Sequence, residues 1–404
     1  MKKVFYPLDL SALAYPMMQT KRTQSNFRFS ATLIEPVRPD ALTRALEEVL
    51  PLYPNFKSKI KSGFFWHKLQ ASEDPVLVTE DAAPPLSPLK KTDTNGYPFR
   101  LAYAENEVVL EVFHAVTDGN IGAFFLSDLL TRYAEIVSET KERTDLSRGL
   151  TLSDAFITYA KKKSLRKISI KSYNGRSVIA LGKKGNYSPV PRLISEEIDL
   201  PRLKIKAKEA ESTITEYIAA CYVTAILEDY EAPLKKPLSL FVPVNLRRFF
   251  PSDTLQNFVC FERINVEKGA SDLSFPAILE TVKAQFRKKI TKEGMQRRVD
   301  DINKCFRLPL VKFIPLCIKR PAFQLVKKII DKVRQTAILS NVGVIELSPV
   351  AASVVKDIRF FLNISRNTPL NVAVVSYAGR CRVDMTCGLK RTEIPDRFFA
   401  LLNK

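Results

Sequence analysis

Histidine is nearly absent from this chain, because only His67 and His114 occur among 404 residues. The six cysteines form no Cys-x-x-Cys pair and have no histidine at ligand spacing, so we expect neither a metal site nor a disulfide framework. No apolar run approaches the ~18 residues of a membrane-spanning helix, and the N-terminus lacks the apolar core of a signal peptide. These absences predict a soluble, cytoplasmic protein with reduced thiols.

Glycine is also scarce, with 13 residues in the whole chain. Neither Gly-x-Gly-x-x-Gly nor Gly-x-x-x-x-Gly-Lys occurs, which argues against a nucleotide-binding α/β fold. No Gly-x-Ser-x-Gly elbow occurs either, which argues against an α/β-hydrolase. The sequence therefore favours chemistry that needs no bound cofactor and no nucleophilic serine.

Positive charge is abundant, since 63 Lys and Arg face 43 Asp and Glu and give a formal charge of +20. Such a field attracts anions, which include the phosphates of coenzyme A, an acidic carrier protein, anionic lipid and nucleic acid. Charge alone does not choose among these partners, and general solubility explains it equally well. A length of 404 residues with 46% hydrophobic residues suits two ordinary domains or one large bilobed unit.

Strand and helix patterns alternate in both halves of the chain. In the first half, residues 26–37 alternate as a half-buried strand and residues 40–50 follow with helical spacing. In the second half, Thr213-x-x-Glu216 is a capping box that opens a helix, and a buried strand follows over residues 239–244. The pattern predicts an α/β protein.

Two basic stretches stand outside this alternation. Residues 161–184 contain nine Lys or Arg and no acidic residue, and we interpret them as part of an interdomain connection that is either a solvated loop or a binding site for phosphates or an acidic partner. Residues 307–334 mix apolar and basic side chains and fit either a peripheral contact with an anionic membrane or a helix cluster packed on a sheet. Three prolines in the second stretch favour the helix cluster.

His114 is the candidate catalytic residue. A strand pattern over residues 107–113 ends on it, and the turn signal Asp118-Gly119 follows, so the imidazole can be aimed into a cleft. Imidazole titrates near neutrality and can take and return a proton. The alternative is a structural histidine bonded to a backbone carbonyl. His67 lies beside the only tryptophan in an aromatic strand, and we assign it no role.

The pattern His114-x-x-x-Asp118-Gly119, between two apolar segments, resembles the active-site motif of the chloramphenicol acetyltransferase-like superfamily. This superfamily includes condensation domains, plant acyltransferases and alcohol acetyltransferases. Condensation domains usually carry a second histidine just before the catalytic one, and here that position is Phe113. The departure argues against a condensation domain more than against catalysis.

Three further segments strengthen the resemblance. Val-Pro-Val-Asn-Leu-Arg at residues 242–247, followed by Asn257-Phe258, resembles a second superfamily pattern, whose arginine forms a structural salt bridge with the aspartate of the histidine motif. The resemblance implies that Arg247 pairs with Asp118, whereas a surface arginine is the alternative. Ser-Asn-x-Gly at residues 340–343 and Ser-Tyr-x-Gly at residues 376–379 also suit the family. They make Ser340, Asn341 and Tyr377 candidates for oxyanion or substrate contacts, with ordinary strand-end residues as the alternative.

The resemblance implies a two-lobed α/β fold, each lobe a mixed sheet flanked by helices, with an active-site tunnel between the lobes. We expect an N-terminal lobe over residues 1–160, a basic connection over 161–190 and a C-terminal lobe over 191–404. The implied activity is transfer of an acyl group, acetyl above all, from an acyl-CoA co-substrate to an alcohol or amine.

In this mechanism His114 is the general base, and the enzyme is a monomer with no metal, no permanent cofactor and no covalent acyl-enzyme. Two alternatives remain open. One is a condensation-type transferase that uses an acidic acyl carrier protein. The other is an inactive basic protein that binds anionic lipid or nucleic acid, although nucleic acid is not an expected partner of the enzyme.

Overall fold

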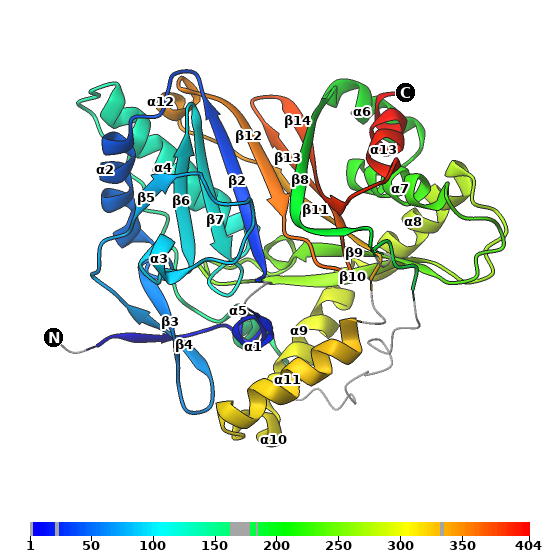
Figure 1. The fold of residues 1–404 in the computed structure, drawn as a ribbon, viewed down its shortest axis with the longest axis horizontal. Coiled ribbons are helices and arrows are strands. Elements are labelled where there is room, and N and C mark those ends of the chain that lie inside the picture. The colour runs from blue at the N-terminus through cyan, green and yellow to red at the C-terminus, as the bar shows by residue number, and fades with distance from the viewer. Residues whose placement is uncertain (1–2, 21–23, 162–177, 183–184, 332–334) are drawn as a thin grey trace.

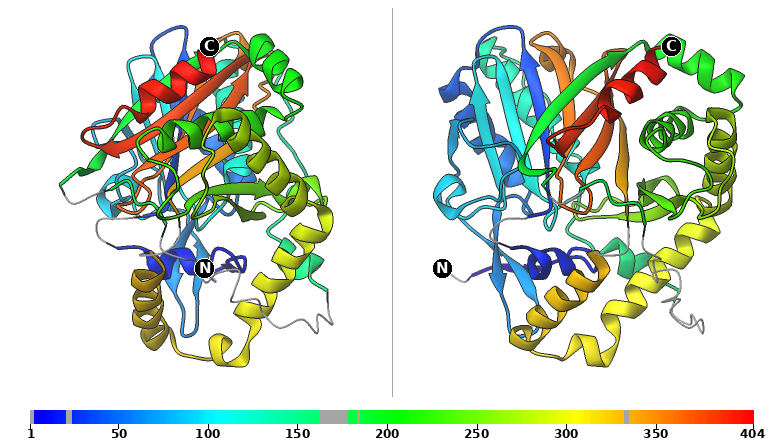
Figure 2. Two further views of the ribbon diagram at one scale, coloured as in Figure 1. Left: turned by 90° about the vertical axis from the view of Figure 1, so that its right-hand side faces the viewer. Right: turned by 45° about the vertical axis from the view of Figure 1, so that its right-hand side comes forward.

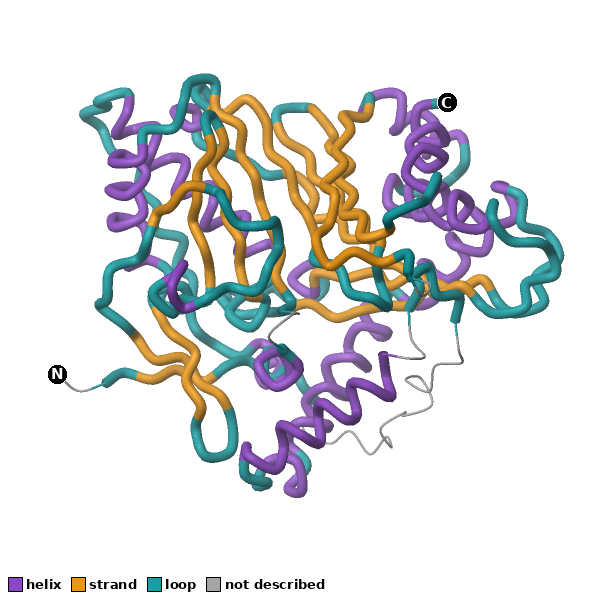
Figure 3. Tube along the Cα trace, viewed as in Figure 1, coloured by secondary structure: helices purple, strands orange, loops and turns teal. Residues whose placement is uncertain are grey.

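Two sheets stand side by side in the computed structural model, each with helices on its outer side (Figures 1 and 3). The structure describes residues 3–20, 24–161, 178–182, 185–331 and 335–404. The strand orders are β12-β2-β7-β6-β5 in the first lobe, β10-β9-β11-β13-β14-β8 in the second, and β1-β4-β3 in a small third sheet. The expected two-lobed α/β fold is confirmed.

The first lobe builds its sheet on an antiparallel core and covers it with two helices, and a short helix lies at its edge. The elements are β2 (Asn26–Leu33), β5 (Val78–Glu80), β6 (Phe99–Ala104), β7 (Glu107–Phe113), α2 (Pro39–Val49), η1 (Leu50–Leu52), α3 (Lys91–Thr94) and α4 (Gly119–Val137). The strand expected over residues 107–113 is present as β7, and it pairs antiparallel with β6.

The second lobe has the larger sheet. Its elements are β8 (Tyr187–Ile198), β9 (Leu238–Asn245), η3 (Leu246–Arg248), β10 (Val259–Val266), β11 (Ala337–Val344), β13 (Leu370–Tyr377), β14 (Arg380–Leu389), α6 (Leu200–Glu209), α7 (Ile214–Leu227), α8 (Phe275–Lys289) and α13 (Ile394–Asn403). The capping box at the start of α7 is formed as predicted, with Thr213 and Glu216 bonded reciprocally. Strand β8 begins inside the stretch 161–190, of which residues 162–177 and 183–184 lie outside the described residues.

The lobes exchange chain segments. Strand β12 (Val355–Leu362) follows α12 (Pro349–Ala352) and pairs with β2, so a strand from late in the chain completes the first lobe's sheet. Residues 246–258, which we call the crossover loop, leave β9 and contact the first lobe before β10 begins. A division of the sequence at residues 160 and 191 does not capture this exchange.

A third layer lies below the two sheets in Figure 1. It holds β1 (Phe5–Pro7), β3 (Ser58–Ser62), β4 (His67–Ala71), α1 (Ala14–Met18), α5 (Ala155–Tyr159), α9 (Lys292–Arg307), α10 (Pro309–Lys312) and α11 (Leu316–Asp331). The helices expected to pack on a sheet instead lie against other helices, α10 on α9 and α11 on α1. Within the described residues, no helix is both long and apolar enough to cross a bilayer.

Strand β2 is buried on both faces, although its alternating sequence predicts one polar face. Arg28 and Ser30 are both buried, because Glu111 of β7 lies beneath them with its side chain fully buried. Glu111 accepts hydrogen bonds from Arg28 at 3.1 Å, from Arg100 at 2.6 Å and from the backbone N–H of Leu86 at 2.7 Å. The alternating pattern predicts that this face of β2 is exposed to solvent. Instead, its polar face packs on a buried carboxylate that is shared by two guanidinium groups.

We expect Glu111→Gln to lower the free energy of unfolding by about 3 kcal/mol or more, because it leaves the buried guanidinium of Arg100 without its carboxylate partner, whereas Arg28 keeps Asp81 at 2.6 Å. Chemical denaturation measures the change. Glu107→Gln on the same strand is the matched control: its partner Arg359 and Glu107 itself are both partly exposed, so a loss of at most about 1 kcal/mol is expected. Equal losses in the two variants would contradict the role given to Glu111.

Candidate active site

His114 directly follows β7 and is clamped by neighbours from the N-terminal part of the chain. Its backbone N–H donates to the carbonyl of Ser25 at 2.8 Å. The ring of Tyr15 in α1 stacks on the imidazole, with centroids 4.9 Å apart and planes 15° apart. Phe27 of β2 approaches edge-on with a centroid distance of 5.5 Å. The half-buried imidazole therefore has a fixed plane.

Asn257 of the crossover loop fixes the tautomer of His114. Its Oδ1 lies 2.8 Å from His114 Nδ1, while its Nδ2 and backbone N–H both donate to Asp9 Oδ2 at 3.1 Å. The amide nitrogen of Asn257 is the atom that faces Asp9 Oδ2, and as a carboxylate oxygen Oδ2 accepts both donors. The amide oxygen then faces His114 and accepts Nδ1–H, which leaves the lone pair of the neutral ring on Nε2.

Asp9 is the buried anchor of this chain of hydrogen bonds. Besides Asn257, it accepts from the Ser11 hydroxyl at 2.6 Å and the Ala12 N–H at 2.9 Å through Oδ1. Burial raises the pKa of Asp9, although these hydrogen bonds pull it down. No motif in the sequence points to Asp9 or Tyr15, and Asn257 stands out only as part of the Asn257-Phe258 match, which assigns it no role.

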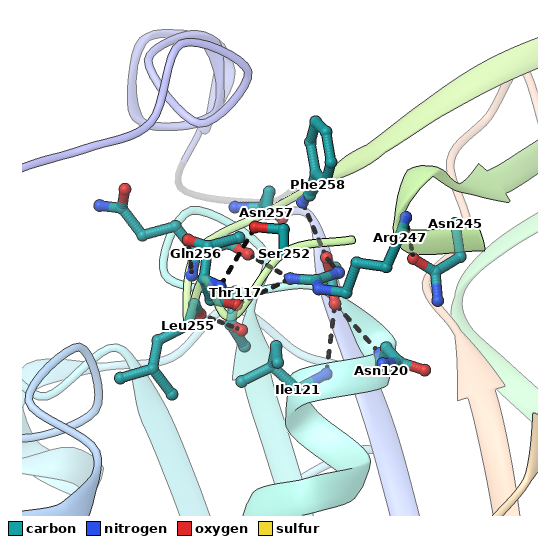
Figure 4. A network of polar contacts seen from close by, with 12 residues as sticks. Thr117, Asn120, Ile121, Asn245, Arg247, Ser252, Leu255, Gln256, Asn257 and Phe258 are labelled. Carbon is teal, nitrogen blue, oxygen red and sulfur yellow. Dashed lines mark hydrogen bonds and ion pairs between the residues drawn. The ribbon is translucent and has the colours of Figure 1, made fainter. Parts of the chain in front are cut away.

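The ion pair that the resemblance implies is present between the lobes. Arg247 Nη1 lies 2.7 Å from Asp118 Oδ2, and Arg247 Nη2 donates to the carbonyls of Thr254 and Gln256 at 2.9 and 2.8 Å. The same Asp118 oxygen accepts the backbone N–H of Phe258 at 2.9 Å. Figure 4 shows Arg247 and Phe258 converging on the start of α4. One guanidinium thus joins the histidine turn to the crossover loop.

Asp118 also caps α4. Its Oδ1 accepts the N–H groups of Asn120 and Ile121, both at 3.2 Å, so the helix begins at Gly119. Burial alone would raise the pKa of Asp118, but the Arg247 guanidinium and the backbone N–H donors outweigh it and hold the pKa below its ordinary value. Asp118 therefore supports the turn from within and does not face a substrate.

Two glycines allow α4 to approach its neighbours closely. A Cβ on Gly122 would lie 2.8 Å from the ring of Phe27, the residue that also contacts His114. A Cβ on Gly119 would lie 3.3 Å from Phe360 of β12 and 3.6 Å from Val342 of β11. The histidine turn therefore touches β11 of the second lobe as well as the exchanged strand.

The remaining sequence candidates are not joined to His114 by any hydrogen bond or ring contact in the described part of the chain. Asn341 donates to Thr215 at 2.9 Å and accepts the Gly343 N–H at 2.9 Å. Tyr377 is buried and donates to the Val355 carbonyl at 3.0 Å. Both side chains thus serve the second lobe and its contact with β12. Ser340 is half-buried in β11, two residues before Val342.

His67 belongs to a different place in the fold. It begins β4 and is 8% exposed. Burial first and the charge of Arg320 second lower its pKa to about 4, so the ring is neutral at physiological pH. The structure gives it a packing position in the third layer, in line with the absence of an assigned role.

The fold has counterparts among solved structures, although the sequence matches no protein-family model and no curated protein. Polyketide synthase associated protein 5 from Mycobacterium tuberculosis is 14% identical with a TM-score of 0.65, over 98% of this chain and 96% of that one. TRI3 trichothecene 15-O-acetyltransferase from Fusarium sporotrichioides is 11% identical with a TM-score of 0.68, over 99% and 94%. The first condensation domain of the CDA synthetase is 13% identical with a TM-score of 0.68, over 99% and 95%.

We expect Arg247→Ala to cost about 3–5 kcal/mol of stability at pH 7, because it leaves the Asp118 carboxylate buried without its cation. The penalty should shrink as the pH falls toward 4. Because the pKa of Asp118 is depressed in the folded wild type, its ionised carboxylate contributes stability above the pKa that it has in the unfolded chain, and this contribution is lost as acid protonates the group. In the variant, the carboxyl can take up a proton, which removes the unpaired buried charge. Denaturation at several pH values measures this.

The neighbouring Arg248 is exposed, so Arg248→Ala is the matched control and should change stability by less than about 0.5 kcal/mol. A penalty for Arg247→Ala that does not vary with pH would count against the buried ion pair.

Proposed function

The chain has the chloramphenicol acetyltransferase-like fold, shared with condensation domains and the TRI3 acetyltransferase, and from that premise we propose that it is an acyltransferase with His114 as its general base. The observation that carries the proposal is the 2.8 Å contact between His114 Nδ1 and the Asn257 side-chain oxygen. Asn257 and Asp9 hold Nδ1 as the protonated nitrogen and leave Nε2, which has no hydrogen-bond partner among the described residues, as the basic one.

The proposed reaction transfers an acyl group from a thioester to an alcohol or amine. Nε2 accepts the proton of the hydroxyl or amino group as its oxygen or nitrogen attacks the thioester carbonyl. The tetrahedral intermediate then collapses with cleavage of the carbon–sulfur bond, and the imidazolium returns its proton to the departing thiolate. General base catalysis of this kind contributes roughly 10²- to 10⁴-fold, and no covalent acyl-enzyme is required.

Acyl-CoA is the donor that we propose, with acetyl as the first acyl group to test. A formal charge of +20 favours association with the phosphates of coenzyme A. A starter condensation domain of this fold has been solved with C8-CoA and Leu-SNAC, which supports thioester donors for the fold.

The alternative donor is an acyl group carried by an acidic carrier protein, since condensation domains share the fold and the positive charge suits such a partner equally. Phe113 stands where condensation domains usually have another histidine, and this favours free acyl-CoA. Rates with an acyl-CoA and with the same acyl group on a carrier protein separate the two.

We expect His114→Ala to lower the rate of thiol release from acyl-CoA by at least about 100-fold while the protein stays folded, because water replaces a positioned base. The assay combines a thiol reagent with pools of alcohols and amines. His67→Ala removes the only other histidine and should retain the rate of the folded protein. Normal turnover by folded His114→Ala would end the proposal and leave a binding protein as the better interpretation.

We expect Asn257→Leu to lower kcat by about tenfold or more. Without the Asn257 oxygen, Nδ1–H of His114 loses its acceptor, so the ring can adopt the tautomer whose Nε2 is protonated and cannot accept the proton of the substrate. Steady-state kinetics with acyl-CoA measure the change.

The matched control for Asn257→Leu is Gln256→Leu. This variant removes the neighbouring amide, which donates to the Pro7 carbonyl instead of contacting His114, and should keep the wild-type kcat. An unchanged kcat in Asn257→Leu would show that Asn257 does not set the tautomer of the ring.

A further inference from the structure

Helix α11 buries a lysine and exposes its apolar residues, the reverse of an ordinary surface helix. Leu316 and Lys319 face inward, and Lys319 is only 3% exposed. Ile318 and Leu325 are 59% and 61% exposed, and Ala322 between them is exposed as well. Because residues i, i+4 and i+7 share a helix face, these three form one outward apolar stripe. Such a stripe marks an interaction surface.

Lys319 fixes the β3–β4 hairpin against this helix. Its ammonium donates to the Phe65 carbonyl at 2.8 Å and lies 3.2 Å from the ring centroid of Trp66. The N–H of Leu316 donates to the Phe64 carbonyl at 2.8 Å. The hairpin tip and the start of α11 are therefore one structural unit, since a buried ammonium satisfied by a carbonyl and an aromatic face is costly to release.

The hairpin adds its own exposed rings to the stripe. Phe64 is 72% exposed, and Phe65 lies edge-on to Phe313, which is 59% exposed. We call the resulting surface the apolar pole; it comprises Phe64, Phe65, Leu308, Phe313, Ile318 and Leu325. These six are among only 15 exposed large hydrophobic side chains in the described residues. Helices α10 and α11 and the β3–β4 hairpin, which carry most of these residues, lie at the lower end of the molecule in Figures 1 and 2.

The two chain segments that carry the apolar pole contain basic residues and no acidic ones, and acidic residues appear only beyond their ends. Residues 302–330 contain seven Lys or Arg and residues 60–72 contain two, and neither segment has an Asp or Glu. Lys61, Lys312 and Arg320 are exposed. Exposed aromatic and aliphatic side chains within a cationic rim match a surface that is anionic outside and hydrocarbon beneath.

We propose that the apolar pole docks onto an anionic lipid bilayer, with Phe64, Ile318 and Leu325 entering the interface and the basic rim contacting lipid phosphates. An acidic protein would satisfy the rim but would leave the outward stripe of α11 and the tip of the hairpin in water. The docking surface lies one helix from the candidate site, because α11 packs on α1 and Tyr15 of α1 stacks on His114. The proposal is independent of the chemistry assigned to His114.

Trp66 provides the experiment, since it is the only tryptophan in the chain and adjoins the hairpin tip. The full-length protein is titrated with vesicles of phosphatidylcholine containing about one third phosphatidylserine, and binding is followed by sedimentation and by quenching of Trp66 with brominated lipid. Wild type should bind these vesicles, should bind pure phosphatidylcholine at least about tenfold more weakly, and should release as salt screens the rim.

The variant Phe64→Ser/Ile318→Ser/Leu325→Ser should bind the anionic vesicles at least about tenfold more weakly, because three inserted side chains are lost. The matched control is Ile34→Ser/Val190→Ser/Ile205→Ser, which removes exposed side chains from other places (59%, 51% and 57% exposed) and should bind as wild type.

Three results would overturn the proposal. The first is that the wild-type protein does not bind anionic vesicles. The second is that the variant Phe64→Ser/Ile318→Ser/Leu325→Ser binds them as strongly as wild type does. The third is polyglutamate binding that matches vesicle binding in strength and is equally unaffected by the pole substitutions, which would make the surface a site for acidic polymers. Because binding is read without substrate, failure here leaves the acyltransferase assays untouched.

Discussion

The ion pair between Asp118 and Arg247 is the contact on which the candidate site depends. It spans 129 residues of sequence and joins the turn after His114 to the crossover loop. The same guanidinium holds two carbonyls of that loop, and the loop carries Asn257 to His114 Nδ1. A single buried charge pair therefore couples the start of α4, the path of the loop and the state of the imidazole.

The site is assembled from segments that lie far apart in the sequence. Asp9 lies 248 residues from Asn257 and fixes the direction of its amide, and Tyr15 covers the imidazole face. None of these side chains needs to touch a substrate. Their shared effect is to hold one nitrogen of His114 as donor and leave the other as acceptor, which is the preparation that a general base requires.

The sequence pattern predicted those elements whose formation depends on residues close together in the chain. The capping box of Thr213 and Glu216 and the strands expected over residues 107–113 and 239–244 all appear, because caps and strand patterns depend on neighbouring residues. The place of β12 in the first sheet could not be predicted in this way, since strand order depends on the whole chain. Asp9 had no signal of its own: one acidic residue in an irregular segment becomes informative only when its distant partner is known.

Helix α11 shows that helical spacing in the sequence does not predict which face of a helix is buried. An apolar stripe at helical spacing predicts which side chains share a face, but it does not say which face the rest of the molecule covers. The expectation that this region packs on a sheet assumed that the apolar face is the covered one. Here Lys319 is drawn inward because the Phe65 carbonyl and the Trp66 ring satisfy its ammonium. That arrangement turns Ile318 and Leu325 outward, so the side chains that pattern assigns to the core become the exposed ones.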